Sequence, residues 1–232
     1  MHIRRFLKTR LKNVLNGLGY EIRALNRLRA PDAIVYNTAE YADRFYSNRS
    51  LVNKYRKESV SQHLQNLRIL LDEENIRLYK DMTILDASCG TGDCLKMLWD
   101  EFGCRHLTGT DISGAALAIT REICPQAELH ELDLEKQKLP GDFDLVLCQQ
   151  VLEHLVEPET ALHNLTAMLR PGGVLVITVP DGRLDDFAGH VHFWGSDSLP
   201  IFLRKELPGC NIRTGHLQDE VSLFAIITDP RA

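Results

Sequence analysis

The spacing of apolar residues changes near residue 82 and divides the chain into two parts. After that point, short apolar runs of strand length alternate with segments in which apolar residues recur every three or four positions. A cap at Ser113 and a proline at position 158 mark the starts of two helices. The alternation predicts a parallel sheet with helices on both faces. The predicted strands are residues 83–87, 106–110, 128–134, 143–148 and 174–179.

The carboxyl-terminal part departs from this alternation. The helix from Pro158 is expected to run to Leu169, and residues 171–173, Pro-Gly-Gly, to form a turn. Residues 199–206 have helical spacing, and residues 211–217 and 221–228 then have the pattern of two strands with a short connection. A short connection joins antiparallel neighbours, so we expect a terminal antiparallel hairpin on an otherwise parallel sheet.

The segment before residue 80 has a different pattern. Residues 1–18 place apolar residues on one helical face and most basic residues on the other. Residues 31–50 are polar and aromatic without a clear period, whereas residues 51–79 have helical spacing. We therefore expect a basic amphipathic helix in residues 1–30, an aromatic and helical lid segment in residues 31–79, and an α/β domain in residues 80–232. The apolar stripe of the second helical stretch is Val60, Leu64, Leu67 and Leu71.

Composition excludes several classes of protein. The chain has 232 residues, of which 44% are hydrophobic and 25% charged, as in ordinary globular proteins. No apolar run approaches the roughly 18 residues of a membrane span, and no secretory signal pattern is present. The six cysteines contain no C-x-x-C, so we expect reduced thiols, no metal site and a cytoplasmic protein.

Charge is unevenly distributed along the chain. Residues 1–30 carry a net charge of +7, so the remainder carries −12 within the total of −5. An acidic body predicts no nucleic-acid partner. The basic segment has three readings: a helix lying on an anionic membrane surface through residues 1–18, a helix packed on the domain or a second subunit, or a mitochondrial-type presequence. The chain is expected to be a monomer or a homodimer.

Residues 84–92, ILDASCGTG, combine a strand, a glycine turn and the start of a helix. Gly90 and Gly92 permit a sharp bend and close approach of a ligand to the backbone. Asp111, at the end of the next strand, can accept hydrogen bonds from both hydroxyls of a ribose. These features predict a nucleoside cofactor. Leu95 stands where a dinucleotide fingerprint has its third glycine, so an NAD site is poorly supported.

Four stretches together resemble the class I S-adenosylmethionine-dependent methyltransferases of the ubiquinone-biosynthesis-like type. They are ILDASCGTG (84–92), GTDIS (109–113), FDLVLCQQVLEHL (143–155) and LRPGGVLVITVP (169–180). The resemblance implies a doubly wound, mostly parallel seven-stranded α/β sheet of order 3-2-1-4-5-7-6 with an antiparallel last strand. It also implies S-adenosylmethionine as cofactor. The chain departs from the family pattern at Ser88, where the family has a glycine.

The resemblance assigns roles by position. Asp86 and the two glycines would surround the methionine part of the cofactor, and Asp111 would hold the ribose, unless it only caps a helix. Ile112 would lie against the adenine and Asp133 near its amino group, unless Asp133 is only a loop carboxylate. Gln149 would line the methionyl side. The expected cofactor-binding residues are Asp86, Ala87, Ser88, Gly90, Gly92, Asp111, Ile112, Asp133, Leu134 and Gln149.

Three histidines are candidates for a general base toward a hydroxyl acceptor, because histidine titrates near neutral pH. His154 follows the fourth predicted strand, and His190 and His192 lie in the loop after the fifth. On an extended segment the last two would point to one side. Alternatively, His154 only ties its loop to neighbouring backbone, and His190 and His192 are ordinary loop histidines. Phe193 and Trp194 would stack on an acceptor ring or simply pack, and Asp181 is a weaker candidate base.

The expected function is methyl transfer from S-adenosylmethionine, most readily to an oxygen of a sugar, glycan or other small acceptor. The glycan reading uses the likeness of residues 1–23 to the N-termini of methyltransferases of surface-polysaccharide assembly. One alternative is a quinone-like or lipid-like aromatic acceptor, which a membrane-lying helix would also serve. Another is a methyltransferase-like binding module that has lost catalysis.

Overall fold

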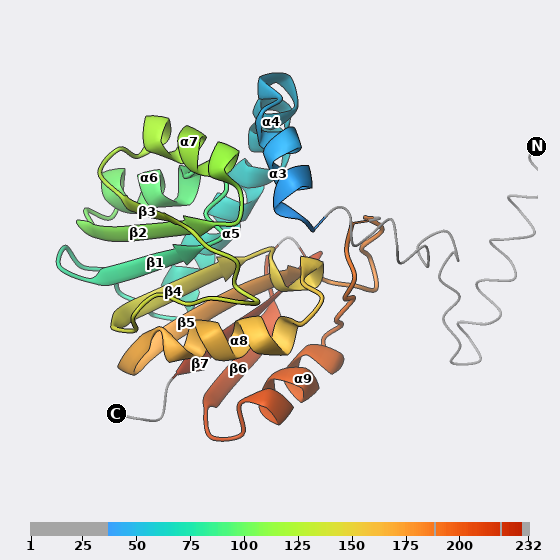
Figure 1. Cartoon of the computed structure of the whole chain (residues 1–232). Coiled ribbons are helices and arrows are strands. Elements are labelled where there is room, and N and C mark those ends of the chain that lie inside the picture. Colours follow the sequence, from blue (N-terminus) through green and yellow to red (C-terminus); the bar gives the residue numbers. More distant parts are fainter. Residues whose placement is uncertain (1–36, 188, 219, 229–232) are drawn as a thin grey trace, which may run out of the picture.

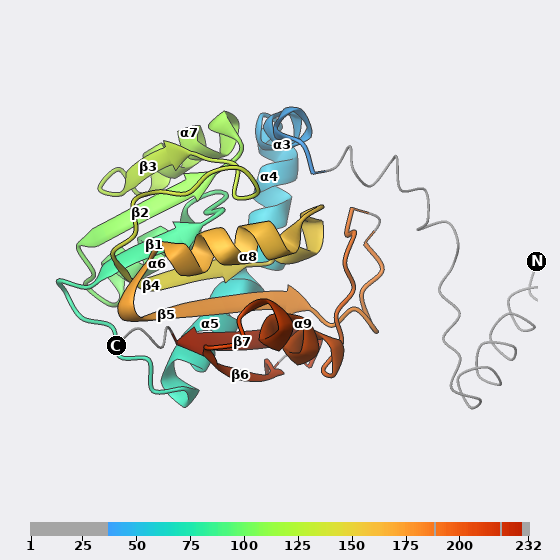
Figure 2. The same cartoon turned by 60° about the horizontal axis from the view of Figure 1, so that its bottom comes forward.

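Seven strands form one sheet in the order β3-β2-β1-β4-β5-β7-β6 (Figures 1 and 2). The computed structural model describes residues 37–187, 189–218 and 220–228, so the predicted basic helix lies outside the described residues. The β5–β7 and β6–β7 pairs are antiparallel and the other pairs parallel, which confirms the expected sheet. The strands are β1 (Thr83–Ala87), β2 (His106–Asp111), β3 (Glu128–Glu131), β4 (Phe143–Gln149), β5 (Leu169–Pro180), β6 (Asn211–His216) and β7 (Ser222–Thr228).

Helices cover both faces of the sheet. They are α3 (Ala39–Tyr46), α4 (Arg49–Tyr55), α5 (Ser61–Glu73), α6 (Asp93–Asp100), α7 (Gly114–Ile123), α8 (Pro158–Ala167) and α9 (Ser198–Glu206). A π-helical turn, η2 (Arg56–Val60), joins α4 to α5, and a 3₁₀ turn, η3 (Leu152–His154), follows β4. None of the helices in the described part is both long and apolar enough to cross a bilayer.

The core has two halves because successive side chains of a strand point to opposite faces. On one face, Leu85 and Val146 pack with apolar residues of α8 and α9. On the other, Ile84 and Leu145 pack with α5 and α6. Burial on both faces explains why the central strands are continuous apolar runs.

Several element limits differ from the prediction, most of them by one residue, and the helical stretch predicted to residue 79 ends at Glu73. The strand predicted over residues 128–134 ends at Glu131, and the helix from Pro158 ends at Ala167. Residues 171–173 belong to β5 rather than to a turn, at a register shift against β4. Gly173 fits there because a Cβ would lie 2.8 Å from the Phe143 carbonyl oxygen.

Helix α3 forms in a segment whose sequence shows no helical period. Thr38 caps it, and Asp43 ties it to the start of α7 by accepting hydrogen bonds from Ser113 Oγ at 2.6 Å and the Ala115 N–H at 3.0 Å. Figure 1 shows α3 standing beside the carboxyl ends of the central strands. The helix is therefore held in place by a partner distant in sequence.

Candidate active site

The glycine turn after β1 is built from left-handed backbone conformations. Ser88, Gly90 and Gly92 have φ values of 67°, 54° and 78°. A Cβ on Gly92 would lie 2.6 Å from Cγ2 of Thr120, so a side chain there meets both strain and a clash. Ser88 adopts the conformation that glycine favours, at a cost of about 1 kcal/mol. Its backbone geometry therefore matches the glycine that the family has at this position.

Asp111 connects the end of β2 to this turn. Its Oδ2 accepts a 2.9 Å hydrogen bond from the Gly90 N–H, and its Oδ1 accepts one of 2.9 Å from the Ser113 N–H. Burial raises the pKa of Asp111 to about 6, although these two hydrogen bonds act to lower it. The side-chain cap of α7 comes from Ser113, which accepts from the Ala116 N–H. The Asp111 carboxylate lies at the turn, in position to face a ligand held there.

Asp86, on β1, is a buried carboxylate whose Oδ2 has no hydrogen-bond partner. Burial raises its pKa to about 7, and the nearby charge of Asp111 adds to this while a bond with the Cys94 thiol opposes it. Buried carboxylates without a partner are costly. A cationic ligand group at this turn would relieve the cost, whereas a pyrophosphate would increase it.

The other predicted cofactor residues fall into separate environments. Gln149 Nε2 lies 3.4 Å from Cys94 Sγ, so the end of β4 is linked to α6 beside Asp86. Asp133 instead accepts a hydrogen bond from the Glu135 N–H and pairs with Lys136 at 2.6 Å. Ile112 is half-buried, while Ala87 and Leu134 are buried in the core.

Two tyrosines of the predicted lid segment, Tyr46 and Tyr55, act on this site, although the sequence gave neither of them a role of its own. The Tyr46 hydroxyl lies 3.1 Å from where a Cβ of Gly90 would be. Burial and the charge of Asp111 raise the pKa of Tyr46, and burial, Glu153 and Asp111 raise that of Tyr55 to about 12. Both phenols therefore keep their protons at neutral pH. The aromatic content of residues 31–50 was the available signal for Tyr46, but without a period it assigned no position.

The structure brings two of the three candidate histidines together. His154, from η3, and His190, from the loop after β5, have ring centroids 4.5 Å apart. Burial, followed by the charge of His190, lowers the pKa of His154 to about 4, so this ring is neutral at pH 7. The Asp185 carboxylate lies 2.5 Å from His190 Nδ1.

The third histidine lies in a different environment. His192 stacks on Trp194 at a centroid distance of 5.1 Å and an interplanar angle of 10°. Trp194 is only 8% exposed and packs in turn on Phe202. The Trp194 ring therefore belongs to the core, while the Phe193 ring lies 6.4 Å from that of His190.

Asp181, the weaker candidate base, is fully buried in an ion pair. Its Oδ2 lies 2.5 Å from Arg183 Nη2 and 3.4 Å from His216 Nε2. The hydrogen bond with Arg183 holds the pKa of Asp181 below its usual value. This carboxylate is thus engaged in holding the start of the loop.

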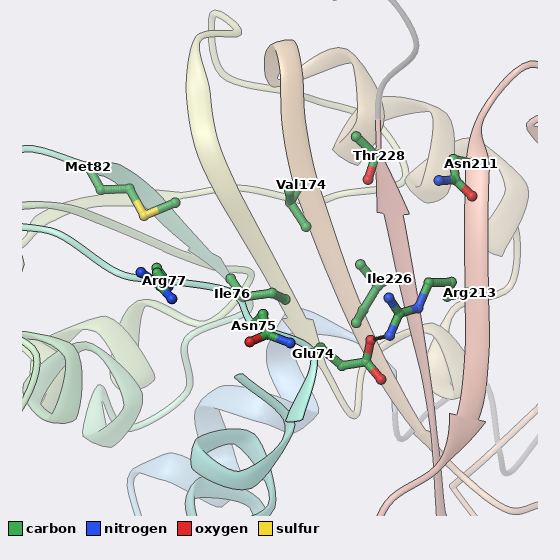
Figure 3. Close-up of a pocket in the computed structure, with 10 residues that line it drawn as sticks. All are labelled: Glu74, Asn75, Ile76, Arg77, Met82, Val174, Asn211, Arg213, Ile226 and Thr228. Carbon is green, nitrogen blue, oxygen red and sulfur yellow. Dashed lines mark ion pairs between the residues drawn. The ribbon is translucent and has the colours of Figure 1, made fainter. Parts of the chain in front are cut away.

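A cavity of about 350 Å³ lies away from these residues (Figure 3). Its lining includes Met82, just before β1, and Val174 and Thr228, which pair near the start of β5. These positions belong to the amino ends of the parallel strands, opposite the glycine turn. Arg213 and Glu74 form an ion pair at its wall. None of the predicted site residues lines it.

The chain is similar to known proteins in the region that contains the glycine turn and Asp111. Residues 85–175 match a family described as a methyltransferase domain. A trans-aconitate 2-methyltransferase of Delftia acidovorans is 35% identical over 122 residues, which cover 51% of this chain and 45% of that protein. A ubiquinone biosynthesis O-methyltransferase of Colwellia psychrerythraea is 28% identical over 130 residues, covering 53% and 51%. The chain thus spans about half the length, or less, of these curated relatives.

Solved structures show the same fold. The N-methyltransferase NodS of Bradyrhizobium japonicum, in complex with S-adenosylhomocysteine, has a TM-score of 0.63 and 22% identity, covering 84% of this chain and 99% of NodS. The plantazolicin methyltransferase BpumL has a TM-score of 0.67 and 14% identity, covering 87% and 98%. The seven-stranded sheet and the glycine turn are those of the Rossmann-like methyltransferase fold. The match of residues 85–175 to a methyltransferase domain, with these relatives, confirms the resemblance to the class I S-adenosylmethionine-dependent methyltransferases.

Proposed function

We propose that this chain transfers the methyl group of S-adenosylmethionine to an oxygen of a small acceptor. The observation that carries the proposal is the buried Asp86 carboxylate with an unpartnered oxygen, set at the glycine turn beside Asp111. S-adenosylmethionine carries a sulfonium and an amino group, so its positive charge complements these carboxylates. The pyrophosphate of NAD would meet repulsion there.

The reaction is an in-line displacement at the methyl carbon. An acceptor oxygen forms a bond to that carbon, the carbon–sulfur bond breaks, and its electron pair stays on sulfur to give S-adenosylhomocysteine. The methyl group is already activated, so the protein mainly aligns the reactants. A hydroxyl acceptor must also lose its proton, and His190, held by Asp185, is the group we assign to take it in the metal-free protein.

The charge of the site favours a neutral hydroxyl acceptor. The Asp185 carboxylate lies beside His190, and Arg56 is held in a 2.5 Å ion pair with Asp93. A polycarboxylate acceptor would therefore be repelled at the acceptor side. A sugar hydroxyl is our first choice and a phenol or quinol the second, since the exposed Phe187 ring, 4.9 Å from that of His190, offers a stacking surface to either.

The first test is calorimetric titration of the full chain with S-adenosylhomocysteine, with NAD as the parallel ligand and Asp111→Ala as the variant. We expect micromolar binding of S-adenosylhomocysteine that the substitution abolishes, and no binding of NAD. Absence of S-adenosylhomocysteine binding to the folded protein would overturn the proposal.

A second test identifies the acceptor. The protein is incubated with labelled S-adenosylmethionine and separate pools of nucleotide sugars, catechols and trans-aconitate, and methylated products are detected by mass spectrometry. We expect transfer to a hydroxylated pool and none to trans-aconitate. Cofactor binding without transfer to any pool would favour the inactive binding module.

A further inference from the structure

Glu153, His154 and His190 form a cluster of metal-ligating groups at the carboxyl ends of β4 and β5. One donor atom from each side chain can be chosen so that all lie within 4.8 Å of one another. Glu153 Oε1 lies 4.0 Å from His190 Nε2. Two residues come from η3, directly after β4, and the third comes from the loop after β5. The cluster is therefore assembled from two neighbouring strand ends.

The Glu153 carboxylate has no hydrogen-bond partner within the described structure. The residue is 1% exposed, and neither of its carboxylate oxygens makes a hydrogen bond. Its backbone carbonyl oxygen, by contrast, accepts from the N–H groups of Val191 at 2.8 Å and His192 at 3.1 Å. The fold thus places a buried acid at a fixed position and leaves its side chain unsatisfied. Such a group calls for a ligand or an ion.

Both imidazole rings are oriented from outside the cluster. Asp185 Oδ2 lies 2.5 Å from Nδ1 of His190, which leaves Nε2 directed toward Glu153. The ring of His154 is hydrogen-bonded to the backbone of Gly189. Metal-binding histidines have this arrangement, in which one ring nitrogen donates to a carboxylate or carbonyl and the other binds the ion.

We propose that Glu153, His154 and His190 bind a divalent first-row transition metal ion, with Asp185 and the Gly189 carbonyl orienting the two rings. Two imidazoles and one carboxylate suit zinc, iron or cobalt and leave coordination positions open. Ligands at about 2.1 Å from a tetrahedral ion lie about 3.4 Å apart, so donor atoms that lie within 4.8 Å of one another need to approach by up to about 1.4 Å. This site was not predicted from the sequence, where the expectation of no metal site came from the spacing of the cysteines alone.

The ion would serve the acceptor side of the site, a role that depends on the proposed function. The cluster and the cofactor turn follow the carboxyl ends of neighbouring strands, β4 and β1, and both Glu153 and Asp111 act electrostatically on Tyr55. An open coordination position can bind an acceptor hydroxyl and lower its pKa. The two histidines are then ligands, and the hydroxyl proton leaves to water.

The test measures metal binding without turnover. The full chain, stripped with chelator, is titrated with Co²⁺ while visible absorption is recorded, and with Zn²⁺ and Mg²⁺ by calorimetry. We expect one Co²⁺ per chain without a thiolate charge-transfer band, competition by Zn²⁺, and much weaker binding of Mg²⁺. A thiolate band at one equivalent would overturn the proposal, because the ion would then be held by cysteine.

Variants make the assignment specific. Glu153→Gln and His190→Ala should each weaken Co²⁺ binding at least tenfold, and Asp185→Asn by about 10- to 100-fold through loss of ring orientation. His192→Ala is the matched control, because it lies in the same loop and stacks on Trp194 instead. Equal Co²⁺ affinity in wild type and all variants would refute the site.

S-adenosylhomocysteine titration of the same samples separates this proposal from the proposed function. Retained S-adenosylhomocysteine binding shows that a variant is folded, so its lost metal binding supports the site. A wild-type chain that binds Co²⁺ but not S-adenosylhomocysteine would keep the metal site and refute the methyltransferase proposal. A chain that binds S-adenosylhomocysteine but not Co²⁺ would refute the metal site and keep the methyltransferase proposal.

Discussion

The backbone N–H of Gly90 donates a 2.9 Å hydrogen bond to Oδ2 of Asp111, although the residues lie on successive β–α units. This bond sets the acid that is proposed to bind the ribose against the turn that is proposed to receive the methionine part of the cofactor. A change at either residue should therefore act on cofactor binding before it acts on the acceptor.

Asp111→Ala is expected to weaken S-adenosylhomocysteine binding by at least 100-fold, because charge-assisted bonds to two ribose hydroxyls are lost at about 1.5–3 kcal/mol each. Asp133→Ala is the comparison, and we expect less than about a tenfold effect since Asp133 already pairs with Lys136. Isothermal calorimetry measures both. An equal loss in the two variants would contradict the geometry described for Asp133.

Cofactor binding should release a proton near neutral pH. The pKa of Asp86 is about 7 in the unliganded protein because burial disfavours its charge. A cationic amino group beside it lowers that pKa, so the carboxyl group ionises on binding. Calorimetry at pH 6.5 in buffers of different ionisation enthalpy should show this release, and Asp86→Asn should reduce it. A binding enthalpy independent of buffer would contradict the prediction.

The contribution of Asp86 and Asp111 to the stability of the unliganded protein should fall as pH rises from about 4 to 7. Asp86 and Asp111 have folded pKa values of about 7 and 6, above the unfolded value of about 3.9. Their contribution is fully present below pH 3.9 and is lost as pH passes the folded values. Asp86→Asn should therefore stabilise the protein at pH 8, by roughly 2–4 kcal/mol in urea unfolding. A variant that is less stable at that pH would show that the buried charge is already compensated.

Gly92→Ala should destabilise the protein more than Gly103→Ala. Both glycines have positive φ, of 78° and 71°, so both substitutions carry about 1 kcal/mol of backbone strain. Only at Gly92 does the new methyl group meet other atoms, 2.6 Å from Thr120, whereas at Gly103 nothing lies within 4 Å. We expect a difference of about 2 kcal/mol in thermal unfolding. Equal losses would mean that α7 moves freely to make room.

Asp43→Ala should loosen α3 without unfolding the domain. Asp43 holds the helix to α7 through Ser113 Oγ and the Ala115 N–H. Hydrogen exchange of residues 39–46 should become faster, and S-adenosylhomocysteine should bind more weakly, because Tyr46 on this helix lies against the glycine turn. Glu40→Ala, on the same helix and exposed, is the control and should change neither. Unchanged exchange in the Asp43 variant would show that other contacts hold α3.

The sequence by itself determined the order of strands and helices, the glycine turn and the acid at the end of β2. These features depend on local patterns: continuous apolar runs, a change of period and residues that tolerate positive φ. The sheet order followed from the resemblance to a known family. The sequence analysis gave no helix at α3, which Thr38 caps and which Asp43 anchors to a distant helix.

Only the tertiary structure decided how the histidines are grouped. Alternation along an extended segment placed His190 and His192 on one side, but the loop turns where the Glu153 carbonyl oxygen accepts from two successive N–H groups. His190 then joins His154 and Glu153, and His192 stacks on Trp194. Loop paths are set by hydrogen bonds and burial between residues far apart in the chain, and a local pattern contains no record of such contacts.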